Sequence, residues 1–456
     1  MTSLTQYIDL YRLNAEAIDS HSSPLMNGKR PEAARALEGK RLPEKGDEGF
    51  KVTSIEKMFE PDYGVNILRM NIPTEIGRTF RCDIPNVSTL LGVVVNDSFV
   101  ATSTLRQNLP SGVDVMPLSK ACELYPDIIG KYYNNIAPAN EPSVALNTML
   151  AQEGLFIRLG RGVHLESPIQ IVNIFNSPSP LMGVRRVLVV AEQDSKGSIF
   201  FCDHTQTSDV RFLASEIIEV AGERGSELDI YSIEETTALT SRYSRLFTRQ
   251  DEGSTVRVGS TTLRCGITRN EYDIKLEGEH SSAYLSGMAV ADGHMHVDNR
   301  SNVNHLAPHC NSDQLFKYLL DDNAQGAFEG GIYVDPAAPF TAGYQNNRNI
   351  IASEGARMHT EPQLLIYNDE VKCSHGTATG QLDANALFYM QARGIPYNTA
   401  RKMLMLAFMT DALDTIKVEG IKSRLSMLVE KRLGGEQMLC ADCQADCHTN
   451  ITTPRE

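Results

Sequence analysis

The segment Ile169-Gln170-Ile171-Val172-Asn173-Ile174-Phe175 decides the fold class of this chain. It is short and rich in β-branched residues, and turn-forming residues follow it, as is typical of a strand. Similar short runs lie before and after it, at Leu155–Leu159, Val187–Val190, Ser198–Cys202, Ser226–Tyr231 and Val256–Val258. More than about ten such strands in roughly 220 residues predict a mainly β unit over residues 151–380.

Two β architectures fit these strands. Asn-Gly and Asp-Gly hairpin turns are mostly missing, with Asp292-Gly293 as the exception, so a simple antiparallel meander is disfavoured. A parallel β-helix fits one-directional coiling, because each coil buries its apolar side against the next coil. The strands follow no clean fixed repeat, so their spacing alone leaves a β-sandwich and a parallel β-helix both open.

The regions on either side of the β unit favour helices. Residues 1–150 are mixed and helix-leaning, and their apolar spacing predicts helices at Leu4–Ile18, Pro31–Glu38, Leu118–Tyr125 and Ser143–Glu153. Residues 381–435 form a C-terminal helical region with three predicted helices, at Leu382–Arg393, Asn398–Ile416 and Glu419–Leu433.

The two longer C-terminal helices carry apolar stripes. On the middle helix the predicted stripe is Ala400, Met403, Leu404, Ala407 and Phe408. Its methionines suit an adaptable contact surface, and they suit ordinary core packing equally well. On the last helix the side chains predicted to face inward are Ile421, Leu425, Leu428 and Val429, and Arg424 is among the charged residues predicted to face outward.

Composition and charge exclude several classes of function. The chain has 456 residues and a formal net charge of −14, which is poorly suited to nucleic acid or an anionic membrane surface. No run approaches the ~20 apolar residues that a membrane-spanning helix needs. The N-terminus lacks the basic start and apolar stretch of a secretory signal, so we expect a cytoplasmic location. Phosphate-loop, GxGxxG, HExxH and GxSxG motifs are absent, and no catalytic residue is predicted.

Cysteine and histidine are the residues that point to chemistry. Cys373 and His375 are two positions apart, so on a strand the thiol and the imidazole would project from one face. Such a pair can supply two ligands to a soft or borderline metal, and a buried thiol beside a surface histidine is the structural alternative. His294 and His296 have the same spacing and would likewise share a face on a strand.

A second group of thiols lies near the C-terminus. Residues 436–456 follow Gly434-Gly435 and are expected to be a flexible tail that contains Cys440, Cys443, Cys447 and His448. Three thiols and an imidazole at this spacing can close around zinc or iron. A CxxC pair near a chain end can also work as a thiol pair without metal.

Longer motifs give this chain a resemblance to a known family. Asp298–Gln314, Phe328–Val334, Thr341–Asn349 and Leu387–Ile395 are similar, in the same order, to the SufB/SufD family of iron–sulfur cluster assembly proteins. Within that family, Cys373-Ser374-His375-Gly376 resembles the SufD form and not the SufB form. His359-Thr360 has no cysteine just before it, unlike SufB, which implies that the main sulfur-accepting thiol belongs to a partner chain.

The resemblance implies a fold and a role. The fold is a right-handed parallel β-helix with N-terminal and C-terminal helical regions. The role is a non-ATPase scaffold subunit, not an enzyme, that pairs with a SufB-like subunit through the β-helix and binds a SufC-like ATPase through the C-terminal helices. Cys373 and His375 match interface positions associated with binding iron or a nascent cluster, held transiently and shared with the SufB-like subunit.

The resemblance further implies that no cofactor is stably bound to the isolated chain. The expected ATPase contact is the middle C-terminal helix, with Met403, Leu404, Ala407 and Phe408. Closure of two SufC-like subunits would pull on residues 382–433 and open the interface around Cys373 and His375 to iron and sulfur. A homodimer in isolation is left open. The alternatives are a β-helix carbohydrate-active enzyme and a homodimeric structural protein without metal chemistry.

Overall fold

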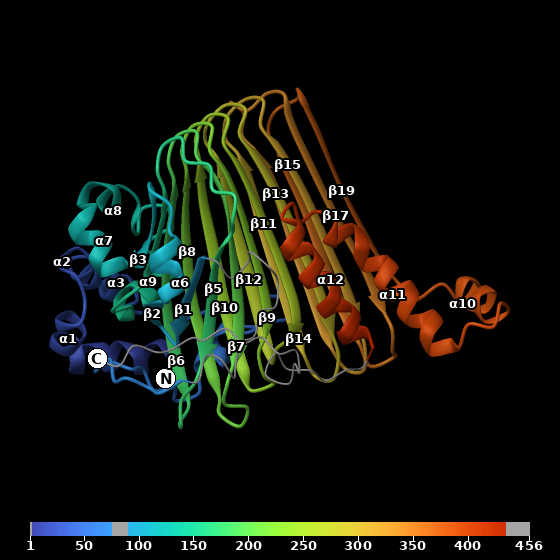
Figure 1. Cartoon of the computed structure of the whole chain (residues 1–456), viewed down its shortest axis with the longest axis horizontal. Coiled ribbons are helices and arrows are strands. Elements are labelled where there is room, and N and C mark those ends of the chain that lie inside the picture. Colours follow the sequence, from blue (N-terminus) through green and yellow to red (C-terminus); the bar gives the residue numbers. More distant parts are fainter. Residues whose placement is uncertain (1, 75–89, 435–456) are drawn as a thin grey trace.

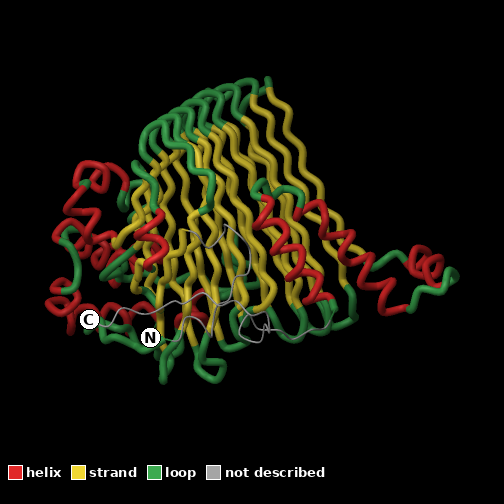
Figure 2. The backbone as a smooth tube through the Cα atoms, in the orientation of Figure 1, coloured by secondary structure: helices red, strands yellow, loops and turns green. Residues whose placement is uncertain are grey.

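Two long parallel sheets, wound from one coiling chain, form the centre of the molecule (Figures 1 and 2). The computed structural model describes residues 2–74 and 90–434. From β4 onward successive strands alternate between the sheets, so that each coil contributes one strand to each sheet. This arrangement is a parallel β-helix, so the alternative prediction of a β-sandwich is wrong.

We call the sheets odd and even after the numbers of most of their strands. The odd sheet has the order β19-β17-β15-β13-β11-β9-β7-β5-β1-β2, with β2 as its exception. The even sheet has the order β18-β16-β14-β12-β10-β8-β6-β4-β3, with β3 as its exception. The odd sheet consists of β1 Leu90–Val95, β2 Ser98–Ala101, β5 Ile169–Phe175, β7 Lys196–Thr205, β9 Glu227–Glu235, β11 Thr255–Arg264, β13 Ser282–Ala291, β15 Asn311–Leu320, β17 Thr341–Ile351 and β19 Val371–Gly380. The even sheet consists of β3 Val113–Pro117, β4 Leu155–Leu159, β6 Leu181–Ala191, β8 Phe212–Gly222, β10 Thr240–Gln250, β12 Ile267–Leu276, β14 His296–His305, β16 Gln325–Val334 and β18 Arg357–Ile366.

The coils differ in length, and this explains why the sequence has no fixed repeat. Paired residues on neighbouring strands are 26 positions apart between β10 and β12, where Ser241 faces Ile267. They are 32 apart between β16 and β18, where Gln325 faces Arg357. The strands stay in register because the turns absorb the difference, so the repeat is preserved in space and not in residue number.

Most of the N-terminal helices cover the outer face of the even sheet, whereas α6 (Ser103–Asn108) packs on β1 of the odd sheet and places Leu105 in the core between the sheets. The others are α1 Ser3–Ser20, α2 Pro24–Asn27, α3 Arg30–Ala36, α4 Ile55–Phe59, α7 Leu118–Leu124, α8 Pro126–Tyr132 and α9 Pro142–Leu150. Leu4 and Tyr7 of α1 and Met149 of α9 share one buried cluster with Val184 of β6 and Tyr243 of β10. The four predicted helices are confirmed within a few residues, whereas strands β1, β2 and β3 were not predicted in this region.

The C-terminal helices α11 (Tyr397–Leu413) and α12 (Glu419–Leu433) pack on the outer face of the odd sheet. Helix α10 (Ala384–Gln391) has no buried residue and projects away from the sheets (Figure 1). None of the helices within the described residues has the length and hydrophobicity to cross a bilayer.

Two details of these helices differ from the prediction. The buried stripe of α11 consists of Ala400, Met405, Met409, Ala412 and Leu413, so the predicted stripe is confirmed only at Ala400, because the helix packs through the side next to the predicted one. On α12, Arg424 is buried and not outward, since the helix lies on the sheet along much of its length.

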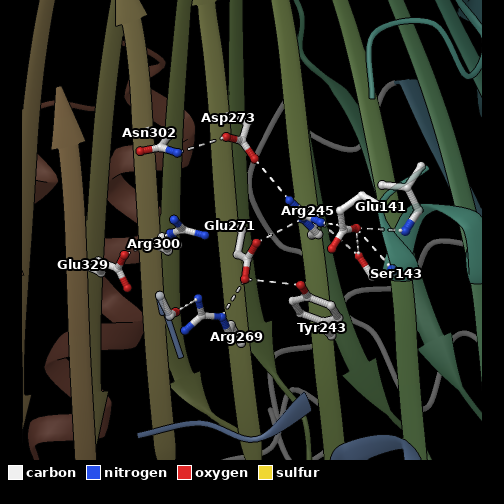
Figure 3. A network of polar contacts seen from close by, with 12 residues as sticks. Glu141, Ser143, Tyr243, Arg245, Arg269, Glu271, Asp273, Arg300, Asn302 and Glu329 are labelled. Atoms are coloured by element: carbon white, nitrogen blue, oxygen red, sulfur yellow. Dashed lines mark hydrogen bonds and ion pairs between the residues drawn. The ribbon is translucent and has the colours of Figure 1, made fainter. Parts of the chain in front are cut away.

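A network of buried charges joins the N-terminal region to the even sheet (Figure 3). Arg245 of β10 makes ion pairs with Glu141, which caps α9, and with Glu271 of β12 at 3.0 Å. Glu271 also pairs with Arg269 at 2.7 Å and accepts a hydrogen bond from Tyr243 at 3.2 Å. Arg245 also pairs with Asp273, and Arg269 also pairs with Asp298, so removing one carboxylate leaves less negative charge to balance buried guanidinium groups in a poor solvent for ions.

We predict that Glu271→Gln lowers stability at neutral pH by roughly 3 kcal/mol, because it removes the one carboxylate that pairs with both Arg245 and Arg269 and leaves these buried guanidinium groups with less balancing charge. Burial alone would raise the pKa of Glu271, but Arg245 and Arg269 outweigh burial and lower the pKa to about 2. The wild-type advantage is therefore present above pH 4.5 and is lost as pH falls toward 2. The urea midpoints of the wild type and of Glu271→Gln, compared across this pH range, measure the difference in stability.

Glu16→Gln is the matched control, since Glu16 is exposed on α1 and makes no ion pair within the described residues. Equal urea midpoints for Glu271→Gln and Glu16→Gln at pH 7 would refute a stabilising role for the network.

Candidate functional site

Cys373 and His375 lie on β19, the last strand of the odd sheet. The prediction that this motif forms a strand is confirmed, so the two side chains share a face. Cys373 packs beside the buried cluster of Ile332, Val334 and Ala338, which identifies that face as the inner one, between the two sheets. The structure thus brings the thiol and the imidazole into the mouth of the final coil.

The thiol of Cys373 is half-buried, and it has space because its register partner on β17 is a glycine. A Cβ added at Gly343 would lie 3.4 Å from Cys373 Sγ and 3.3 Å from Ile332 Cγ2. Burial raises the pKa of Cys373, and a backbone hydrogen bond at Gly343 opposes part of the rise. At neutral pH the group is therefore mostly a thiol, and binding a metal must release its proton.

His375 ends a row of polar residues inside the β-helix. Gln314 of β15 faces Gln345 of β17, which faces His375. Gln314 and Gln345 are buried, whereas His375 is exposed, because no further coil covers it within the described residues. Gln345 Oε1 is buried and has no hydrogen-bond partner among the described residues. A polar acceptor in need of a donor thus lies directly behind the imidazole.

The mouth of the last coil has two open strand edges. β18 and β19 are the terminal strands of their sheets, and most of their residues are exposed or half-buried. Strands β6 and β8, in contrast, are buried along their whole length. An open strand edge carries backbone N–H and C=O groups with which a strand of another chain can pair.

The pair alone is an incomplete metal site. Among residues 2–74 and 90–434, no group of three or more His, Cys, Asp or Glu side chains is arranged to hold a metal ion. A tetrahedral site needs four ligands, so Cys373 and His375 could supply half of one. Cys440, Cys443, Cys447 and His448 lie outside the described residues, and the prediction for them stays a prediction.

The other histidines indicated by the sequence have different surroundings. His294 and His296 do not share a strand face, because β14 begins at His296 and His294 lies exposed in the turn before it. His296 Nε2 lies 2.7 Å from Thr53 Oγ1 of the N-terminal region. His359 on β18 lies 3.5 Å from Glu361.

The predicted ATPase-contact residues are divided by the packing of α11. Met403 and Ala407 are exposed, whereas Leu404 and Phe408 are half-buried. Lys317 of β15 donates hydrogen bonds to the Phe408 carbonyl and to Asp411, each at 2.6 Å. Three aromatic residues nearby, Phe388 and Tyr389 on α10 and Tyr397 at the start of α11, were not predicted as contact residues. Their side chains are at least as exposed as that of Met403.

Comparison with known proteins identifies relatives over nearly the whole chain. Residues 174–408 match the family described as "SUF system FeS cluster assembly, SufBD core domain", and residues 1–171 match the "SufBD protein N-terminal region". An iron–sulfur cluster assembly SufBD family protein of Synechocystis is 24% identical over 94% of this chain and 96% of its own length.

Two relatives carry the name iron–sulfur cluster assembly protein SufD. The Escherichia coli protein is 33% identical over 40% of this chain and 44% of its own length. The Bacillus subtilis protein is 24% identical over 77% of this chain and 81% of its own length.

We predict that iodoacetamide modifies Cys373 faster than any other described cysteine, because Cys122, Cys202, Cys265 and Cys310 are buried. Only the thiolate reacts, so the rate should rise about tenfold per pH unit until pH passes the raised pKa. Peptide-resolved mass spectrometry of the native chain measures each cysteine separately. Labelling of Cys265 or Cys310 as fast as Cys373 would show that the mouth of the last coil is not the accessible thiol site.

Proposed function

Because the chain belongs to the SufBD family of iron–sulfur cluster assembly proteins, we propose that it is a non-ATPase scaffold subunit with two docking surfaces. The mouth of the last coil, formed by β18 and β19, binds a SufB-like subunit. The C-terminal helices bind a SufC-like ATPase. The single observation that carries this proposal is the open end of the β-helix, where Cys373 and His375 share the inner face of β19, an edge strand whose outer side pairs with no other strand of the described residues.

Several features support pairing at the mouth of the last coil. Each of the two edges offers free backbone N–H and C=O groups that a strand of another chain can pair with. The inner face offers Leu364, Val371 and the half-buried Cys373 for apolar contact. A partner seated there would also remove His375 from water and bring its own side chains toward the thiol.

In this proposal Cys373 and His375 supply two ligands to iron or a nascent cluster, which is the cargo of the complex, and the partner supplies the others. A thiolate and an imidazole are suitable donors for iron. Because burial raises the pKa of Cys373, the cationic iron must drive off the thiol proton, and loading improves as pH rises.

The connection from helix to strand suggests how ATPase motion reaches the thiol. Only Gln381–Asp383 separate the end of β19 from the start of α10, so force on α10 passes directly into the strand. Helix α11 is anchored to β15 by Lys317 with Asp411, and to the end of the same strand by Arg401 with Asp321, at 2.6 Å each. We infer that closing the ATPase subunits shifts the last coil and exposes Cys373 to iron and sulfur.

We predict that Cys373→Ser and His375→Ala each lower the iron and sulfide content of the anaerobically co-expressed complex severalfold, because each removes a ligand. Ser374→Ala is the matched control, since Ser374 lies between them on the opposite face of β19. Metal and sulfide analysis of the purified complex is the measurement, and subunit ratios on a gel show whether the complex still forms.

If both variants carry as much iron and sulfide as the wild type, the ligand assignment is wrong. Deleting residues 436–456 tests the tail thiols separately, and a loss confined to that deletion would make Cys440, Cys443, Cys447 and His448 the working ligands. Purification of a homodimer that excludes the SufB-like subunit would contradict the proposed pairing.

We predict that Met403→Asp and Ala407→Asp on α11 reduce co-purification of the SufC-like ATPase at least fivefold, because each buries a charge in an apolar contact. Both residues are exposed, so the fold should tolerate them. Leu13→Asp on α1 is the control, since Leu13 is an apolar residue with 84% exposure at the other end of the molecule. Unchanged ATPase binding by both α11 variants would place the contact elsewhere.

A further inference from the structure

A cavity lies between the N-terminal region and the turns of the even sheet, away from the last coil. Its volume is about 380 Å³, within the range of small-molecule sites. One wall is the segment from Lys45 to Tyr63, and the other comes from Arg211, the start of β10, Ile267 and His296. Residues more than 200 positions apart in the sequence therefore line one space.

The charged side chains that line the cavity are all basic. Lys45, Lys57 and Arg211 line it, and no aspartate or glutamate does. Within the described residues none of the three forms an ion pair with a carboxylate, although the chain as a whole has a net charge of −14. Three uncompensated positive charges around one cavity create a local field that attracts an anion.

Hydroxyl groups and apolar side chains complete the lining. Ser54 and Ser241 add hydrogen-bonding groups next to the bases. Leu239 and Ile267 also line the cavity and are two of the larger apolar side chains that the protein leaves exposed. The cavity therefore offers both a cationic part and an apolar part, which an inorganic ion would not use together.

The wall formed by the N-terminal segment is held rigidly. Thr53 is buried and bonds to His296 at 2.7 Å and to Asp298. Arg269 donates to the Gly49 carbonyl at 2.6 Å and stacks on the Phe50 ring at 4.1 Å. Because these contacts fix the backbone on both sides of Val52, the cavity is formed before any ligand arrives, which reduces the entropic cost of binding.

We propose that this cavity binds a small organic phosphate, with the phosphate among Lys45, Lys57 and Arg211 and the organic part against Leu239 and Ile267. Three positive charges match a phosphate dianion better than a carboxylate, and Arg211 can hold two phosphate oxygens through its planar fork. The site is separate from the docking surfaces proposed above and does not depend on them.

Calorimetric titration of the full chain with 1-naphthyl phosphate tests the proposal. We expect binding that is tighter than that of inorganic phosphate or 1-naphthol, and that weakens as salt is raised. Lys57→Gln/Arg211→Gln should weaken binding at least tenfold, and Lys275→Gln, which removes an exposed base on β12 outside the cavity, should leave it unchanged. Leu239→Ser should weaken naphthyl phosphate and leave inorganic phosphate unaffected.

Three results would overturn the proposal: no naphthyl phosphate binding at millimolar concentration, equal binding by the double variant and the wild type, or equal binding of 1-naphthoate and 1-naphthyl phosphate. Melting temperatures of all variants check the fold. If the double variant is destabilised, Lys45→Gln/Lys57→Gln replaces it and must give the same loss.

Discussion

In a parallel β-helix, each coil forms its backbone hydrogen bonds and buries its apolar side chains against the neighbouring coils. The two end coils each lack one neighbour, so their edges and apolar side chains need other cover. At the N-terminal end, helix α6 places Leu105 in the core between the sheets, and both sheets end in a different way from the other end. β2 pairs antiparallel with β1, and β3 pairs antiparallel with β4, so each sheet finishes in a short antiparallel strand. Helices α6 and α7 lie next to these strands. At the other end β18 and β19 finish their sheets without such a cap among the described residues.

The chemistry of the proposed site follows from that asymmetry. The same alternation that buries Phe316 and Phe328 in the earlier strands β15 and β16 directs Cys373 and His375 inward in the last coil. In a middle coil a thiol there would be inert core. At the end of the stack it is half-buried and lies next to an exposed imidazole, and the Gln345 oxygen behind them has no hydrogen-bond partner in the part of the chain that the structure describes. In the proposed function, positions that pack the core of earlier coils therefore become metal-ligand positions in the last coil, which no further coil covers within the described residues.

The sequence could predict the local elements because they depend on neighbouring residues. β4 and β5 are confirmed with their bounds unchanged, and α12 is confirmed from Glu419 to Leu433. The choice between sandwich and β-helix came from family motifs, since coil lengths that vary in the turns hide the spatial repeat. The buried face of α11 and the burial of Arg424 depend on which sheet the helices meet, and no helical period contains that information. The bond from Thr53 to His296 joins residues 243 positions apart, so only the assembled fold brings it together.

The central claim is that the mouth of the last coil is covered by a SufB-like partner. Hydrogen–deuterium exchange of the chain alone and in the complex measures this directly, because amides on an open strand edge exchange quickly until another strand pairs with them. We expect β18 and β19 to gain strong protection in the complex while the N-terminal edge strand β2 stays unchanged. Protection that appears elsewhere and leaves β18 and β19 exchanging as in the free chain would contradict the account.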